Sequence, residues 1–327
     1  MKDQQEERVL NSEVALYVGE ALGKYGFPHG HPFGPDRQDA FWKEALKQGL
    51  DKQVRICDPR VALREEIERF HTGEHVDRVD ELSHLGHGSI DYGDTPAYSG
   101  VYDASANVVG AALDGLDRVM SGECYRSFQP IGGLHHARRG TAAGFCVFND
   151  CGVVIDTLRE KYGVRRVAYV DIDVHHGDGL FYPYEDDPDL IYADIHEDGN
   201  YLYPGTGHAF ERGKGAAEGV KLNIPMQPGW GDKEFLRAWE RVEAHLRAHK
   251  PEFIVFQAGA DSIAGDPLAH LQYTPAAHAH AAQSLCGLAN EMTGGRIMGF
   301  GGGGYNWDNL AQAWCAVLSE FIRGSGR

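Results

Sequence analysis

The feature that most constrains the fold of this 327-residue chain is a series of short apolar runs, each followed by a polar turn. Several runs, such as 167–172, are almost continuously apolar, which is typical of parallel strands buried on both faces of a sheet. Polar residues with metal-binding or proton-transfer groups follow three of these runs. The predicted strands cover residues 14–18, 167–172, 190–195, 253–257 and 296–300.

Amphipathic stretches at 101–120, 232–248 and 275–292 separate the apolar runs and repeat their apolar residues at helical spacing. Thr274 and Pro275 are a typical N-cap and first helical residue, and Asp232 is placed to cap the second helix. Strands alternating with helices predict an α/β three-layer sandwich with a central, mostly parallel sheet. Without a repeat or a linker, residues 1–327 are expected to form a single domain.

Composition narrows the function classes. A formal net charge of -17 argues against nucleic acid or an anionic membrane as a partner and favours cationic partners. None of the six cysteines forms a C-x-x-C pair, and most have apolar neighbours, as expected of buried thiols in a reducing compartment. The polar first 13 residues predict no secretory signal, and no apolar run of about 18 residues predicts a membrane span. We therefore expect a cytoplasmic protein, with oligomer formation left open.

A candidate metal site follows two predicted strands. Asp171, Asp173 and His175 alternate with apolar residues, so in an extended chain they share one face. Asp261 follows another strand at the same edge, where parallel α/β sheets bind ligands. Two aspartates and one histidine leave a tetrahedral zinc ion one open position, as a catalytic zinc requires. On its own, the Asp-x-Asp-x-His pattern fits a solvated strand end equally well.

Tandem histidines suggest a proton-transfer group. His135 and His136 follow two glycines in a predicted loop, and histidine can exchange a proton near neutral pH. The chain has 17 histidines, so a structural or surface pair is the competing interpretation.

Five motifs occur together in one order: IGGLHHARRGTAAGFCVFND, YVDIDVHHGDG, YPGTG, QAGADSIAGDPLAHL and GGGGYNW. Together they resemble the zinc-dependent histone deacetylase superfamily, with its arginase-like α/β fold, from about Lys24 to Trp314. Within it, HGHPFGPDR and GADSIAGDPLAHLQYT look most like bacterial acetoin utilisation proteins.

The resemblance implies a role for each site residue. Asp173, His175 and Asp261 would bind zinc, and His136 would act as general base and then as general acid. His135 would be its electrostatic partner. Asp171 and Asp178 would orient the two histidines. Tyr305 would donate a hydrogen bond to the acetyl carbonyl and stabilise the oxyanion.

The same resemblance places substrate-binding residues around an acyl-lysine tunnel. Its walls would be Gly144, Phe145, Tyr203 and Leu268, which read alone are ordinary packing residues. The family often has Phe where Tyr203 stands, so this tunnel is expected to be more polar. Asp94 matches a rim aspartate that holds the substrate, although read alone it is a turn residue.

The family also binds monovalent cations, so potassium is expected besides zinc. One site would use Asp171, Asp173 and His175 with Asp194 and Ile195, and family members often have Ser where Asp194 stands. A second site would rely on backbone carbonyls near Tyr184, Asp187, Leu190 and Val220.

The sequence thus predicts zinc-dependent hydrolysis of an acetylated amine, with acetyl-lysine in proteins as the first candidate substrate. Acetylpolyamines or other small acyl-amines are the alternative substrates, and iron instead of zinc is not excluded. An arginase-like hydrolase with two metals and a catalytically silent binder of acylated ligands are the competing functions.

Overall fold

The structure is a computed structural model that describes residues 13–324. No secretory signal was predicted from the polar first 13 residues. Except for Glu13, these residues lie outside the described part of the chain.

One eight-stranded sheet, in which every pair of neighbours is parallel, runs through the molecule in the order β2-β1-β3-β8-β7-β4-β5-β6. All five predicted strands are present, with ends within two residues of those expected. Three strands were missed because they are short or carry a charged residue. The strands are β1 (Val14–Tyr17), β2 (Arg55–Cys57), β3 (Arg126–Gln129), β4 (Val167–Asp171), β5 (Leu190–Glu197), β6 (Lys221–Met226), β7 (Phe253–Gln257) and β8 (Ile297–Phe300).

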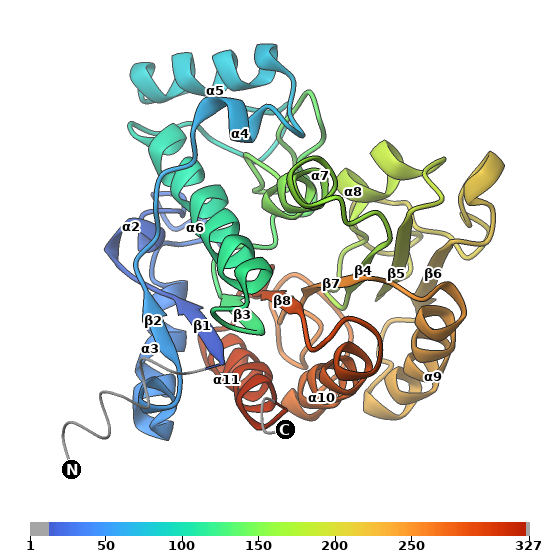
Figure 1. Cartoon of the computed structure of the whole chain (residues 1–327). Helices are drawn as coiled ribbons and strands as arrows, with labels where there is room; N and C mark the ends of the chain where they lie inside the picture. Colours follow the sequence, from blue (N-terminus) through green and yellow to red (C-terminus); the bar gives the residue numbers. More distant parts are fainter. Residues whose placement is uncertain (1–12, 325–327) are drawn as a thin grey trace.

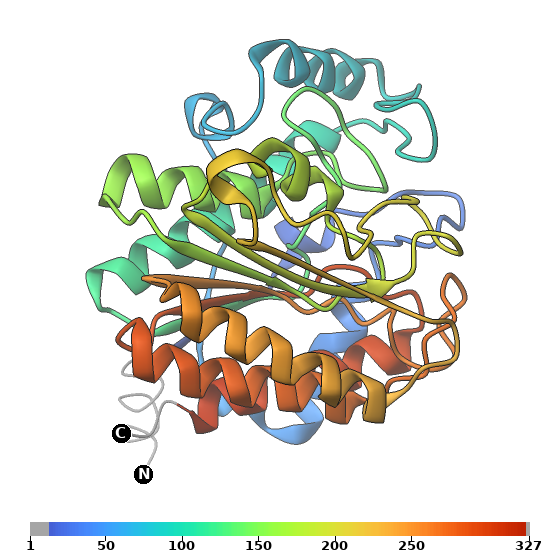
Figure 2. The ribbon, with the colours of Figure 1, turned by 90° about the vertical axis from the view of Figure 1, so that its right-hand side faces the viewer.

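Helices cover both faces of the sheet and make three layers (Figures 1 and 2). The core on one face is shared by α3 (Arg37–Gln48), α9 (Asp232–His249), α10 (Pro275–Met292) and α11 (Trp307–Arg323). The core on the other is shared by α2 (Glu20–Gly23), α4 (Arg64–Ile67), α5 (Gly73–Leu85), α6 (Val101–Ser121), α7 (Asp150–Tyr162) and α8 (Asp178–Phe181). Single 3-10 turns are η1 (Leu50–Lys52), η2 (Tyr182–Tyr184) and η3 (Gly215–Ala217). The predicted sandwich and its three helices, α6, α9 and α10, are confirmed.

The two capping predictions have different outcomes. Thr274 caps α10, accepting a hydrogen bond from the Ala276 N–H at 3.2 Å. The prediction for Asp232 is wrong, because Gly231 is the N-cap of α9. The Asp232 carboxylate instead accepts hydrogen bonds from the backbone N–H and the hydroxyl of Thr274, at 2.8 and 2.6 Å. It therefore ties the start of α9 to the start of α10.

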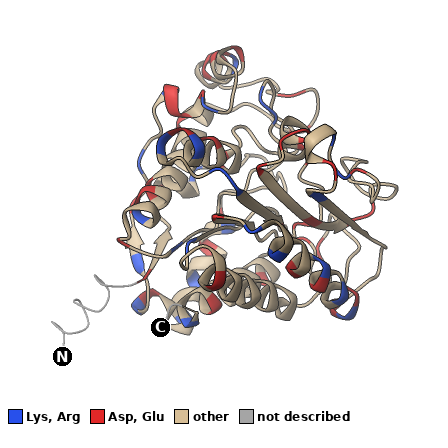
Figure 3. Ribbon diagram, turned by 45° about the vertical axis from the view of Figure 1, so that its right-hand side comes forward, with Lys and Arg blue, Asp and Glu red and all other residues tan. Residues whose placement is uncertain are grey.

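The strand register brings polar residues together at the carboxyl edge of the sheet. Asp171, the last residue of β4, lies opposite Asp194 of β5 on one side and Gln257 of β7 on the other. Charged residues otherwise concentrate on helices and loops (Figure 3). All six cysteines are buried and free, as predicted. Within residues 13–324, no helix is long and apolar enough to cross a membrane.

Candidate active site

Asp173, His175 and Asp261 form a buried cluster in which one ligand atom from each residue lies within 4.8 Å of the others. The Nδ1 atom of His175 lies 3.1 Å from Oδ1 of Asp173 and 3.2 Å from Oδ2 of Asp261. Burial and the neighbouring Asp173 carboxylate raise the pKa of Asp261 to about 7. A cation between the two carboxylates removes this cost, and the donor set fits a tetrahedral zinc ion with one open position.

Backbone and side-chain donors hold the two carboxylates in place. Oδ1 of Asp261 accepts from the Val174 N–H at 2.9 Å. Oδ2 of Asp173 accepts from Nε2 of Gln257 and from the Gly303 N–H, both at 2.8 Å. A Cβ atom on Gly303 would lie 2.1 Å from Oδ2 of Asp261, so glycine is required at this close approach. Such supporting contacts orient metal ligands and set their affinity.

The two histidines lie against this cluster as a buried pair. Nδ1 of His135 lies 2.8 Å from Oδ2 of Asp171, and Nδ1 of His136 lies 2.7 Å from Oδ1 of Asp178. Both Nδ1 atoms are therefore assigned as donors, and the two Nε2 atoms face each other at 3.2 Å, within hydrogen-bonding distance. Burial and the adjacent His135 lower the pKa of His136 to about 4. His136 is thus neutral near pH 7 and can accept a proton, and His135 lies close enough to share it.

Arg138 adds a contact that the sequence did not suggest. Its Nη2 atom lies 2.7 Å from Oδ2 of Asp178, the oxygen that His136 does not use. Burial works to raise the pKa of Asp178, but the hydrogen bonds from His136 and Arg138 outweigh it and lower the pKa to about 2. Asp178 therefore remains ionised and keeps its hydrogen bond to His136.

Tyr305 lies at the small pocket formed by the histidine pair and the metal cluster. The lining includes predicted residues from four separate segments: His135, His136, Gly144, Asp173, His175 and Tyr305. Burial raises the pKa of Tyr305 well above its usual value, as do the carboxylates of Asp261 and Asp173. The phenol therefore stays protonated and can donate a hydrogen bond.

Buried Arg37 positions the glycine loop that precedes Tyr305. It donates hydrogen bonds to the carbonyl oxygens of Gly304 and Gly302 at 2.9 and 2.6 Å, and its guanidinium lies over the Phe33 ring. Asp266 accepts the Tyr305 backbone N–H at 2.8 Å. Neither residue was singled out from the sequence, because their partners are remote in the chain.

The predicted tunnel residues fall at different distances from the pocket. The half-exposed Tyr203 ring has its centroid 5.1 Å from that of His136, and Phe145 lies 5.9 Å from Tyr305. Asp94 is exposed, and its carbonyl oxygen lies 3.1 Å from Nε2 of His31, whose ring packs against Phe145. Of the predicted wall residues only Gly144 lines the pocket; Phe145, Tyr203 and Leu268 lie outside the lining, and Leu268 is in the loop after β7. Its backbone N–H donates to Asp266.

Both carboxylate oxygens of Asp194 already have hydrogen-bond partners within the protein. Its Oδ1 atom lies 2.6 Å from Nδ1 of His196, and its Oδ2 atom accepts from the Gly177 N–H and the Tyr192 hydroxyl at 2.9 and 2.5 Å. Ile195 beside it is fully buried. Asp194 therefore differs from a serine hydroxyl in holding an ion pair with a buried histidine.

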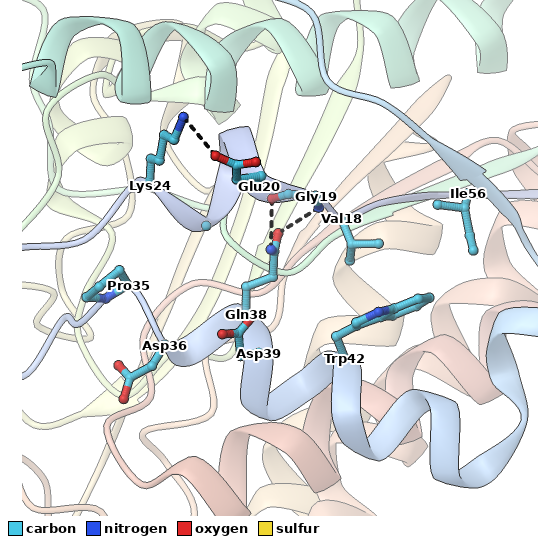
Figure 4. A pocket seen from close by; sticks show the side chains of 11 residues that line it. Val18, Gly19, Glu20, Lys24, Pro35, Asp36, Gln38, Asp39, Trp42 and Ile56 are labelled. Carbon is cyan, nitrogen blue, oxygen red and sulfur yellow. Dashed lines mark hydrogen bonds and ion pairs between the residues drawn. The ribbon is translucent and has the colours of Figure 1, made fainter.

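A wider pocket of about 670 Å³ lies beside β1, α2 and α3 (Figure 4). Several of its polar groups pair with one another: Lys24 pairs with Glu20 at 3.2 Å, and Gln38 bonds both backbone polar groups of Gly19. No histidine lines it. This wider pocket therefore lacks the combination of histidine, carboxylate and tyrosine groups that meets at the small one.

Comparison with known proteins decides the family. The model of the histone deacetylase domain matches residues 31–321. The chain belongs to the histone deacetylase family. The acetoin utilization protein AcuC of Bacillus subtilis (strain 168) is 36% identical over 327 residues, covering 95% of this chain and 82% of AcuC. The AcuC of Staphylococcus xylosus is 35% identical over 320 residues, covering 94% and 82%.

The fold of this deacetylase is also that of its family. The crystal structure of the HDA15 HD domain matches with a TM-score of 0.88 and 29% identity, covering 96% of this chain and 89% of that one. In the part of the chain that the structure describes, Asp173, His175 and Asp261 are the one group of three or more acidic, histidine or cysteine side chains with metal-binding geometry. This favours a single metal over an arginase-like pair.

Proposed function

We propose that this deacetylase is a zinc-dependent hydrolase that converts an acetylated amine, first of all acetyl-lysine in a protein, into a free amine and acetate. The observation that carries the proposal is the buried His135–His136 pair, each ring held by an aspartate, beside a buried Asp-His-Asp cluster. A base, a metal site and the Tyr305 hydroxyl around one pocket are the parts that amide hydrolysis requires.

Zinc bound by Asp173, His175 and Asp261 would polarise the amide carbonyl and make water a stronger nucleophile. The chain's own residues move the protons. Nε2 of His136 takes a proton from the attacking water, while Asp178 holds the ring through Nδ1. His135, hydrogen-bonded to Asp171, shares that proton across the 3.2 Å gap. His136 then donates the proton to the departing amine.

Tyr305 supports the charge that develops on the acetyl oxygen. The protonated phenol of Tyr305 donates a hydrogen bond to that oxygen. The rings of Phe33 and Phe145 pack against the Tyr305 ring. Arg37 keeps the preceding glycine loop in place through two carbonyl oxygens. The substrate's amine-bearing chain would pass Gly144, Phe145, Tyr203 and Leu268.

The rim favours a cationic or peptide substrate. Asp94 is exposed near the pocket mouth, and the whole chain has a formal net charge of -17. An acetyl-lysine peptide and an acetylated polyamine both satisfy this requirement. Nucleic acid and membrane are not proposed as partners.

For the monovalent site, Asp171, Asp194 and Ile195 are the residues we assign to potassium, with Asp173 and His175. The Asp194 carboxylate would add negative charge that a serine does not supply. Six buried free cysteines fit the reducing cytoplasm as the working compartment.

The decisive experiment measures deacetylation by the purified, zinc-loaded protein on an acetyl-lysine peptide and on acetylated polyamines, each with and without a chelator. His136→Ala is the matched control, because it should keep the metal and lose the base. Chelator-sensitive turnover of the peptide supports a protein deacetylase. Turnover of polyamines alone moves the substrate to small amines. No turnover of either by a zinc-loaded protein favours a silent binder and contradicts the proposal.

A further inference from the structure

Lys221, the first residue of β6, is a lysine buried in the protein interior. Only 1% of its surface is exposed, and β6 is an edge strand of the sheet (Figure 1). Lysine is almost never fully buried unless its charge is compensated. Among residues 13–324, however, no carboxylate lies within ion-pairing distance of this ammonium.

Backbone carbonyls compensate the charge instead. Nζ of Lys221 donates hydrogen bonds to the carbonyl oxygens of Asp187 and Leu190, at 2.7 and 2.5 Å. Both acceptors belong to the segment that leads from η2 into β5. The Asp187 side chain, which forms an ion pair with Arg159, adds negative charge nearby. The ammonium thus lies against two backbone carbonyl oxygens, those of Asp187 and Leu190, and it bridges the starts of β5 and β6.

The same carbonyls belong to the second monovalent-cation site that the family resemblance implied, and they do not fit a free ion here. Lys221 takes the Asp187 and Leu190 oxygens. The Val220 oxygen lies 3.2 Å from the Tyr192 N–H and 3.1 Å from Nε2 of His245. A potassium ion needs a ring of oxygens in place of its water shell. In this chain two oxygens of that site bond the Lys221 ammonium, and the Tyr184 carbonyl oxygen accepts the Asp187 N–H at 3.1 Å.

We propose that Lys221 is a tethered cation: its ammonium takes the place of a free monovalent ion between η2 and β5, so the protein binds no potassium there. An ammonium group carries the same charge as a potassium ion. It donates hydrogen bonds to the oxygens that would otherwise coordinate the ion. Because it is covalently attached, it does not have to be captured from solution, and it acts at any potassium concentration.

The tethered ammonium is expected to affect the stability of the fold and not the catalytic reaction. Lys221 lies at the amino end of β6, whereas the metal ligands follow the carboxyl ends of β4 and β7. The proposal is therefore independent of the proposed deacetylation, and its test does not use turnover.

The test is thermal unfolding of the full chain in potassium chloride and in choline chloride at equal concentration. Lys221→Ser removes the ammonium and frees the carbonyl oxygens of Asp187 and Leu190. This variant should melt lower than wild type in choline and recover by roughly 2–4 °C in potassium, since an ion that binds only the folded state stabilises it. The rise in melting temperature of wild type from choline to potassium chloride measures any response of the other proposed site. The proposal is tested by how much larger this rise is in Lys221→Ser.

Two further variants serve as controls. Lys214→Ser removes a lysine whose side chain is 71% exposed and paired with Glu185, and it should respond to potassium as wild type does. Lys221→Met keeps the length of the side chain without its charge. It should melt lower in both salts without recovery, because the uncharged side chain still occupies the space beside the two carbonyl oxygens. Equal potassium gains for Lys221→Ser and wild type would refute the proposal.

Crystals soaked in thallium(I), a potassium substitute with strong anomalous scattering, give a second readout that works even if Lys221→Ser does not fold. Wild type should show Nζ of Lys221 and no thallium between the Asp187 and Leu190 oxygens. Thallium at that position in wild type would overturn the proposal.

Discussion

Replacing Tyr305 by Phe removes one hydroxyl group and leaves the ring contacts of the pocket intact. The ring centroid lies 6.4 Å from that of Phe33 and 5.9 Å from that of Phe145, and a phenylalanine ring keeps both contacts. The variant should therefore fold with nearly wild-type stability and the same zinc content. Since the phenol stays protonated, the variant loses one hydrogen-bond donor to the developing oxyanion.

Loss of one oxyanion donor lowers kcat about 10²–10³-fold, equivalent to roughly 2.7–4 kcal/mol of transition-state stabilisation. We expect kcat of Tyr305→Phe on an acetyl-lysine peptide to fall by this amount, with KM changed far less. The assay is steady-state kinetics, with zinc content and Tm measured on the same preparation. A folded, zinc-loaded variant with kcat within about threefold of wild type would refute the assignment of Tyr305, because a donor to the oxyanion is worth more than that.

Three further predictions concern the histidine pair. His136→Ala should retain zinc and lose turnover; loss of zinc, measured by metal analysis, would make His136 a ligand instead. Gly144→Ala should lower turnover with zinc retained, because φ at Gly144 is +52° and a Cβ there would lie 2.5 Å from Cδ2 of His136; unchanged kinetics would show that this contact relaxes freely. Arg138→Gln should be less stable than wild type at neutral pH, because Arg138 helps to depress the pKa of Asp178 from 3.8 to about 2. A carboxyl whose folded pKa is depressed contributes stability above its unfolded pKa and loses it as the pH falls through the folded value, so the difference in unfolding free energy should narrow from pH 3.8 toward 2. Denaturant unfolding at several pH values checks this, and a constant difference would contradict it.

Much of the candidate metal cluster was predictable because its pattern is local. Asp171, Asp173 and His175 follow the two-residue period of an extended chain, and Asp261 follows a recognisable buried strand. The strands rich in apolar residues were predictable for the same reason. In contrast, β3 and β6 begin with Arg126 and Lys221, and this charge hides them in the sequence pattern.

The supporting contacts were not predictable from the residues alone. Arg37 bonds the Gly302 carbonyl 265 positions away, and Gln257 reaches Asp173 across two paired strands. Asp232 looked like a helix cap, yet its carboxylate bonds Thr274 instead. In each case a polar side chain had several possible partners, and only the packed structure selected one.

The sequence by itself determined the parallel α/β architecture, the family and the chemical types of the site residues, because periodicity and short motifs are properties of neighbouring residues. Only the tertiary structure decided that Arg138 holds Asp178, that Arg37 holds the Tyr305 loop and that Lys221 bonds two backbone carbonyls. The physical reason is that the charge of a buried group must be compensated by whatever the fold brings within hydrogen-bonding distance, and that distance is not encoded in local sequence.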